Sequence, residues 1–247
     1  MKNILQGYLF LFLLSTFISC GPGNQNIRNN RPKKTTGTPT NNLLKSYINS
    51  VKNYDNAYAL YYEGILIENH RKIPIKCFHQ KNKAFIVSVF FEGKQIFPIY
   101  FYDKEGFKWI GDQYINLNES EKKTIKQILS SGWYFKGYDL YKKKYSFTIV
   151  EEHFLWNGQP VSIIKTLEKD ITWIFYIEKQ HGLIVKLEKK EHGEKIFEME
   201  FMDFRIKNGM EIPHHWLIHM TNPPEDYKII WKSIKINIEN PFNQFSK

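Results

Sequence analysis

Residues 170–222 read DITWIFYIEKQHGLIVKLEKKEHGEKIFEMEFMDFRIKNGMEIPHHWLIHMTN. Apolar residues occupy alternate positions in the runs that contain Trp173, Leu183 and Phe197. This alternation is typical of β-strands with one buried face. Residue–glycine pairs separate the runs, and glycine adopts the positive φ of tight hairpin turns at little cost. We therefore predict an antiparallel meander with turns at His181-Gly182, His192-Gly193 and Asn208-Gly209.

The pattern of short strands extends over the rest of the chain. Further strands are predicted at residues 58–68, 72–79, 84–91, 95–102, 145–156, 160–168 and 227–240. Together with the meander they amount to about eleven strands, most of them joined by hairpins. Residues 84–87 and 97–101 are apolar on both faces, so something covers their second face or that face lines a cavity.

Two segments have helical periodicity instead. The first has Thr40, Asn41 or Asn42 available as its cap. The second begins with Asn118 and Glu121, at the spacing of a capping box, and ends near residue 132. The apolar stripe of the first helix consists of Leu43, Leu44, Tyr47, Ile48, Val51 and Tyr54. These elements predict a mainly β (α+β) domain, a strongly curved antiparallel sheet that forms an unclosed β-barrel with helices packed in its concave face.

The size and charge of the chain narrow the possible partners. It has 247 residues, 42% of them hydrophobic, and a formal net charge of +10. One sizeable folded domain is expected at this length. A basic chain can bind nucleic acid or anionic lipid headgroups. The N-terminal segment favours the membrane, so we expect no nucleic-acid partner.

The N-terminal segment, residues 1–20, reads MKNILQGYLFLFLLSTFISC. Its apolar run is shorter than the roughly 20 residues that a membrane-spanning helix needs, but it fits the core of a signal peptide. The ending, Phe17-Ile18-Ser19-Cys20, resembles the lipobox of bacterial lipoproteins. That resemblance implies a lipoprotein signal peptide at 1–19 and a lipid such as palmitate on Cys20. The alternative is an ordinary cleaved signal that leaves Cys20 unmodified.

Residues 21–41 are rich in Gly, Asn, Thr, Pro and basic side chains. Such a segment cannot bury enough apolar surface to offset the entropy of ordering it. We therefore predict a lipidated Cys20 and flexible basic tether at 20–41, followed by a folded domain at 42–247. The domain would be a monomer facing the periplasm, at the outer rather than the inner membrane, since Gly21 differs from the Asp of the enterobacterial inner-membrane signal.

Cys77 is the second of two cysteines. If Cys20 carries lipid, Cys77 has no partner for an intrachain disulfide. It alternates with Ile73 and Ile75 on one face of a predicted strand. We therefore predict a buried, inert thiol.

Two motifs in the meander resemble those of a known superfamily. One is W-I-F-Y-I-E at 173–178 with G-L-I-V-K-L-E at 182–188; the other runs from F-M-D-F-R at 201–205 to Pro213. Both are similar to patterns of the periplasmic lipoprotein-sorting proteins, which include the carrier LolA, the receptor LolB and stress-sensing sigma-factor regulators. Glu178 and His181 stand where Asp and Thr are usual. The resemblance implies an unclosed barrel, a helical lid and an apolar cavity that receives acyl chains.

Motifs for catalysis are absent from the sequence. It contains no nucleophile elbow, phosphate-binding glycine loop or zinc-protease helix. His215 and His219 would lie about 13 Å apart along one strand, too far to share a metal ion. Asp203 and Arg205 share a face of their strand and are predicted to form a structural ion pair. We therefore expect no enzymatic activity, no cofactor and no metal.

The candidate site that remains is apolar. Some residues of the meander share one face, either as ordinary core or as the lining of an acyl pocket. These residues are Trp173, Phe175, Phe197, Met199, Phe201, Trp216, Ile218 and Met220. The leading prediction is a membrane-anchored lipoprotein that binds acyl chains or lipidated proteins in this cavity. The alternative is a non-enzymatic interaction or stress-sensing module of the envelope with a filled core.

Overall fold

The computed structural model describes residues 38–68, 70–91, 93–110, 113–119, 121–122, 125, 134–221 and 224–242. Within them the helices are α2 (Thr38–Ser50), the 3-10 helix η1 (Lys52–Asn56) and α4 (Lys136–Lys142). The strands are β1 (Ala59–Glu68), β2 (Arg71–Gln80), β3 (Ala84–Phe91), β4 (Lys94–Tyr102), β5 (Glu105–Ile110), β6 (Gln113–Asn116), β7 (Phe147–Trp156), β8 (Gln159–Glu168), β9 (Ile171–Glu178), β10 (Ile184–Glu191), β11 (Glu194–Lys207), β12 (Met210–Thr221) and β13 (Pro224–Ile236).

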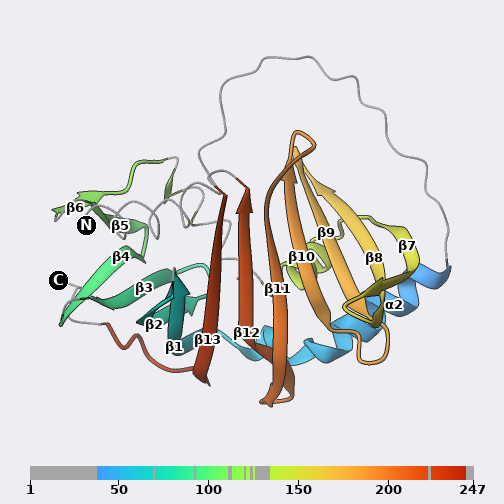
Figure 1. The fold of residues 1–247 in the computed structure, drawn as a ribbon, viewed down its shortest axis with the longest axis horizontal. Helices are drawn as coiled ribbons and strands as arrows, with labels where there is room; N and C mark the ends of the chain where they lie inside the picture. The colour runs from blue at the N-terminus through green and yellow to red at the C-terminus, as the bar shows by residue number, and fades with distance from the viewer. Residues whose placement is uncertain are drawn as a thin grey trace.

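All thirteen strands belong to one sheet, in the order β6-β5-β4-β3-β2-β1-β13-β12-β11-β10-β9-β8-β7. Neighbours in this order are antiparallel, and the first and last strands of the chain pair with each other in the middle of the sheet, with Leu60 opposite Ile236. The sheet is strongly curved and its edge strands β6 and β7 do not pair (Figure 1). The predicted fold, a mainly β, unclosed antiparallel barrel, is therefore confirmed.

The predicted strand count of about eleven is too low because the sequence pattern does not reveal β5 and β6. Residues 103–106 look like a long turn, but the turn is confined to Asp103 and Lys104, which both have positive φ (48° and 75°). Strand β5 begins at the next residue, Glu105. In β6 all four residues are exposed, so no apolar alternation marks it.

The first predicted helix is present, and its apolar stripe is buried except for Leu43 and Ile48, which are partly buried. Tyr47, Val51 and Tyr54 are at most 2% exposed. The helix begins at Thr38, so residues 38–41 of the predicted tether are helical. Helix α2 and η1 pass across the ends of the strands at which the β9–β10 and β11–β12 turns lie (Figure 1). There the Asn53 side-chain amide donates a hydrogen bond of 3.0 Å to the carbonyl of Asn208.

The capping box of the second predicted helix is confirmed. The Glu121 backbone N–H donates to Asn118 Oδ1 and the Asn118 N–H donates to Glu121 Oε2, both at 2.9 Å. Residues 123–124 and 126–133 of this helix lie outside the described residues, as do the signal peptide, Cys20 and residues 21–37 of the tether. Helix α4 is an element that the sequence pattern does not predict.

Apolar side chains form two clusters on opposite faces of the sheet. The larger lies inside the curve, between the strands and helices α2 and α4. The smaller covers the outer face of β1–β4, where Tyr61 and Phe97 contact Phe242 with ring centroids 6.3 and 5.5 Å apart. The second face of these strands is thus covered by the C-terminal segment. Neither α-helix described has the length and apolar character needed to cross a bilayer.

Two predictions concern single side chains, and the structure confirms the first in full and the second in part. Arg205 Nη2 lies 2.6 Å from Asp203 Oδ2 in the predicted ion pair, and Asp203 has a positive φ of 53°. Cys77 is a free cysteine on β2 that is partly rather than fully buried, which corrects the predicted burial, but desolvation still raises the pKa of its thiol to about 12. A thiol with so high a pKa is protonated at neutral pH and unreactive.

The docking of α2 on the β9–β10 turn depends on Gly182. Its φ is +74°, and a Cβ atom there would lie 2.6 Å from the Ser46 carbonyl carbon and 2.7 Å from the Tyr47 nitrogen. We expect Gly182→Ala to lower the free energy of unfolding by about 2–3 kcal/mol, because a strained φ and a backbone clash add. Denaturant unfolding measures this.

Gly193→Ala is the matched control for this substitution. Gly193 has a φ of +88°, but a Cβ atom at this position would have no other atom within 4 Å. Its replacement therefore costs only the strained φ, about 1 kcal/mol. Equal losses in the two variants would show that the contact with α2 contributes nothing.

Candidate functional site

The apolar residues predicted from the meander lie together on the concave face of the sheet. Cross-strand pairs place Phe197 opposite Met220, Met199 opposite Ile218 and Phe201 opposite Trp216. All eight are at most 8% exposed and belong to the inner cluster. Their lining of a ligand cavity stays a prediction, which the structure localises to strands β9, β11 and β12.

Aromatic side chains from outside the meander cover this face. Tyr134 packs edge-on against Phe201 at 5.3 Å between ring centroids, and Phe135 stacks on Tyr54 at 3.9 Å. The Tyr47 hydroxyl accepts a hydrogen bond of 3.1 Å from the Tyr138 backbone N–H. Burial raises the pKa of Tyr47 far above its usual value, so the hydroxyl is neutral. The segment at residues 134–138 is thus bound both to α2 and to the sheet.

Gly137 allows α4 to approach the concave face closely. A Cβ atom at this position would lie 3.1 Å from a ring carbon of Tyr47 and 3.4 Å from a ring carbon of Phe175. The helix therefore sits directly on one of the eight predicted residues. The sequence pattern does not predict this contact, because α4 has only seven residues and no long apolar stripe.

Two buried lysines interrupt the apolar surface near Trp173. Lys136 Nζ lies 2.8 Å from Glu168 Oε2, and the Trp173 indole N–H donates to the same oxygen at 3.0 Å. Lys189 is the cross-strand neighbour of Trp173 and is ion-paired with Glu191. Burial opposes ionisation of Glu168, but the hydrogen bond and charge of Lys136 outweigh it, so the pKa of this carboxyl is lowered.

Two hollows described in the structure open at opposite ends of the strands. One, of about 460 Å³, is bordered by the β7–β8 turn, the β9–β10 turn and residues 201–204 of β11, and it reaches Phe201. The other, of about 350 Å³, lies at the β12–β13 connection and reaches Met220. Each hollow therefore borders the predicted apolar face at one residue, Phe201 or Met220.

The histidines of β12 do not converge on a common point. His214 is buried and its Nδ1 lies 2.9 Å from the carbonyl oxygen of Trp231. Burial lowers the pKa of both His214 and His215, so both are neutral at pH 7. His219 lies on the outer face, where its Nδ1 is 2.8 Å from Asp226 Oδ1.

The open antiparallel barrel with helices against its concave face is shared with solved structures of low sequence identity. The structure is similar to a LolA superfamily protein from Nitrosomonas europaea, with a TM-score of 0.54, 10% identity, and 84% of this chain and 97% of that chain covered. It is also similar to a DUF1329 family protein from Desulfovibrio piger, with a TM-score of 0.56, 9% identity, and 84% and 97% covered. The resemblance predicted from the two motifs is therefore confirmed for the fold.

Comparisons of the amino-acid sequence give a different result from the comparison of structures. No protein-family model matches it, and no curated protein matches it either. At about one identical residue in ten, the likeness to the solved structures is one of backbone arrangement.

Proposed function

We propose that the chain is a membrane-anchored lipoprotein of the cell envelope that binds acyl chains or lipidated proteins. The ligand would occupy space between the concave face and the helices, and would exchange between two apolar environments without covalent chemistry. The observation that carries this proposal is the continuous buried apolar face of β9, β11 and β12. The shared fold with a LolA superfamily protein supports it.

The anchor in this proposal is a lipid on Cys20. With residues 38–41 in helix α2, the tether of about seventeen residues that remains would span roughly 23 Å as a flexible coil, so the domain stays close to the membrane surface. Basic side chains in the tether add attraction to anionic headgroups. We place the anchor in the outer membrane, with the domain facing the periplasm as a monomer.

The energetics set a condition on the cavity. Burial of an acyl chain contributes about 0.8 kcal/mol per CH₂ group, but a membrane offers the same gain. A protein site competes only if it is dry and shaped before the ligand arrives. The rings of Tyr134 and Phe135, which pack against Phe201 and Tyr54, must move aside for a chain to reach the centre of the face.

The packing of Tyr134 and Phe135 favours a second candidate function, in which the domain binds a protein partner rather than a lipid. If the aromatic cover stays in place, the interior is filled and the domain acts as an interaction or stress-sensing module of the envelope. It would then present its sheet to a protein partner and bind no acyl chain.

Native mass spectrometry distinguishes the two functions. A version exported to the periplasm with a cleavable signal in place of residues 1–20 would be purified without detergent. We expect it to retain phospholipid or fatty acid, or to bind an added fluorescent acyl probe at one molecule per chain. A chain that is folded by circular dichroism, carries no lipid and binds no probe would contradict lipid binding and leave the interaction module.

A further inference from the structure

The outer face of the meander carries a polar cluster on the side opposite to the apolar site. Glu198 and Glu200 are two residues apart on β11, so they share the face that alternates with Phe197 and Met199. His219 on β12 is the direct cross-strand partner of Glu198. One carboxylate oxygen of each glutamate and one ring nitrogen of the histidine lie within 4.8 Å of one another.

We propose that Glu198, Glu200 and His219 form a binding site for a divalent transition-metal ion, with Zn²⁺ as the best match. An imidazole nitrogen and two carboxylate oxygens are donors that Zn²⁺ accepts in proteins, and water completes the coordination. All three side chains are partly exposed, so an ion can enter from solvent. A site at i and i+2 of one strand and at the facing residue of the next is rigid because the sheet holds it.

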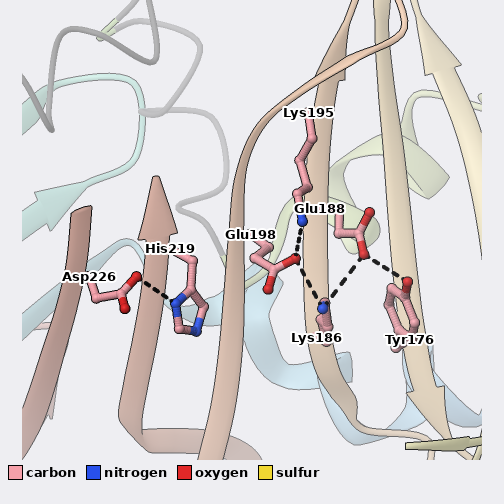
Figure 2. Close-up of polar contacts among 7 residues, drawn as sticks. All are labelled: Tyr176, Lys186, Glu188, Lys195, Glu198, His219 and Asp226. Carbon is pink, nitrogen blue, oxygen red and sulfur yellow. Dashed lines mark hydrogen bonds and ion pairs between the residues drawn. The ribbon is translucent and has the colours of Figure 1, made fainter. Parts of the chain in front are cut away.

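The histidine is oriented for this role by a carboxylate outside the site. His219 Nδ1 lies 2.8 Å from Asp226 Oδ1 on β13, and Figure 2 shows the second ring nitrogen farther from Asp226 and without a drawn partner. An Nδ1–H that donates to Asp226 leaves the lone pair on Nε2. Such a carboxylate–histidine pair behind a metal fixes the tautomer and makes the ring a better ligand.

Two lysines contact one carboxylate oxygen of Glu198 and leave the other available to a metal ion. Lys195 Nζ at 2.7 Å and Lys186 Nζ at 3.0 Å both approach Oε2, so Oε1 is the oxygen for the metal (Figure 2).

The added positive charge of the ion can be accommodated. Lys195 is 42% exposed and can turn toward solvent when the metal binds. Lys186 also lies 3.7 Å from Glu188, which keeps it neutralised, and Glu188 in turn accepts a hydrogen bond of 2.7 Å from Tyr176 (Figure 2). The metal would join β11 to β12 on the outer face, independently of any acyl ligand inside.

Metal titration of the full chain tests this site. The chain would be purified in detergent without a polyhistidine tag, stripped with chelator, and titrated with Zn²⁺ by calorimetry. We expect one strong site per chain. His219→Ala and Glu200→Gln should each weaken Zn²⁺ binding at least tenfold, because each removes one of three protein ligands. His192→Asn, which alters an exposed histidine in the β10–β11 turn, should bind as the wild type does.

A second measurement needs no variant. Zn²⁺ should protect His219, and not His192, from modification by diethyl pyrocarbonate, as mapped by mass spectrometry. Absence of a stoichiometric site in the wild type, unchanged affinity in folded His219→Ala, or equal modification of His219 with and without Zn²⁺ would each overturn the proposal. None of these results bears on acyl binding at the concave face.

Discussion

Replacement of Phe201 by alanine is expected to lower the free energy of unfolding by about 3–5 kcal/mol. Phe201 is 1% exposed and is the one predicted site residue that contacts both Trp216, at 5.9 Å between centroids, and Tyr134, at 5.3 Å. Removal of the ring loses its transfer free energy and leaves a hole between the sheet and its aromatic cover. Denaturation by guanidinium, followed by tryptophan fluorescence, measures the change.

Ile206→Ala on the same strand is the control for Phe201→Ala. Ile206 lies on β11 but is 71% exposed, so its truncation should change the free energy of unfolding by no more than about 0.5 kcal/mol. A similar loss in both variants would mean that the concave face is not the packed side of the sheet.

Lys136→Met should lower the free energy of unfolding by about 3–5 kcal/mol at neutral pH, a loss similar to that expected for Phe201→Ala. The lysine and Glu168 are only 7% and 18% exposed, and removal of the cation leaves a buried carboxylate with Trp173 as a partner. The double variant Lys136→Met/Glu168→Gln should recover part of the loss. Lys142→Met breaks a pair whose side chains are 55% and 51% exposed, and should cost at most about 1 kcal/mol.

The effect of Lys136→Met on the free energy of unfolding should depend on pH in a definite direction. The folded-state pKa of Glu168 is lowered, so its ionised form contributes stability above its unfolded-state pKa and loses it as the pH falls through the folded value. The difference between wild type and Lys136→Met should therefore be largest at neutral pH and shrink in acid. The measurement is the free energy of unfolding as a function of pH, and a difference that grows in acid would contradict the role assigned to Lys136.

Local patterns predict most of the sheet and one face of the candidate site. Period-two alternation and residue–glycine pairs place β7–β13, and the reciprocal bonds of Asn118 and Glu121 follow from their spacing alone. Most of the stripe of α2 is buried as its periodicity predicts. These features depend on residues close in sequence, where periodicity and capping are informative.

Features that depend on residues far apart in the sequence are not predicted. Tyr134 reaches Phe201 across the interior, and Phe242 covers the outer face of β1–β4. Along its own strand His219 has only His215 to consider, which is too far away to share a metal ion, whereas its proposed metal-binding partners, Glu198 and Glu200, are on the next strand. Such contacts follow from strand register and from chain segments that fold back, which a single sequence does not encode as a local pattern.

Photo-cross-linking with a fatty acid that carries a diazirine on its acyl chain tests the central claim most directly. Cross-links to the purified domain would be mapped to single residues by mass spectrometry. Acyl binding at the concave face predicts labels on Phe197, Met199, Phe201, Trp216 or Ile218, and competition by unlabelled fatty acid. Labels confined to exposed residues such as Leu155 and Leu167, or no label that unlabelled fatty acid reduces, would contradict it.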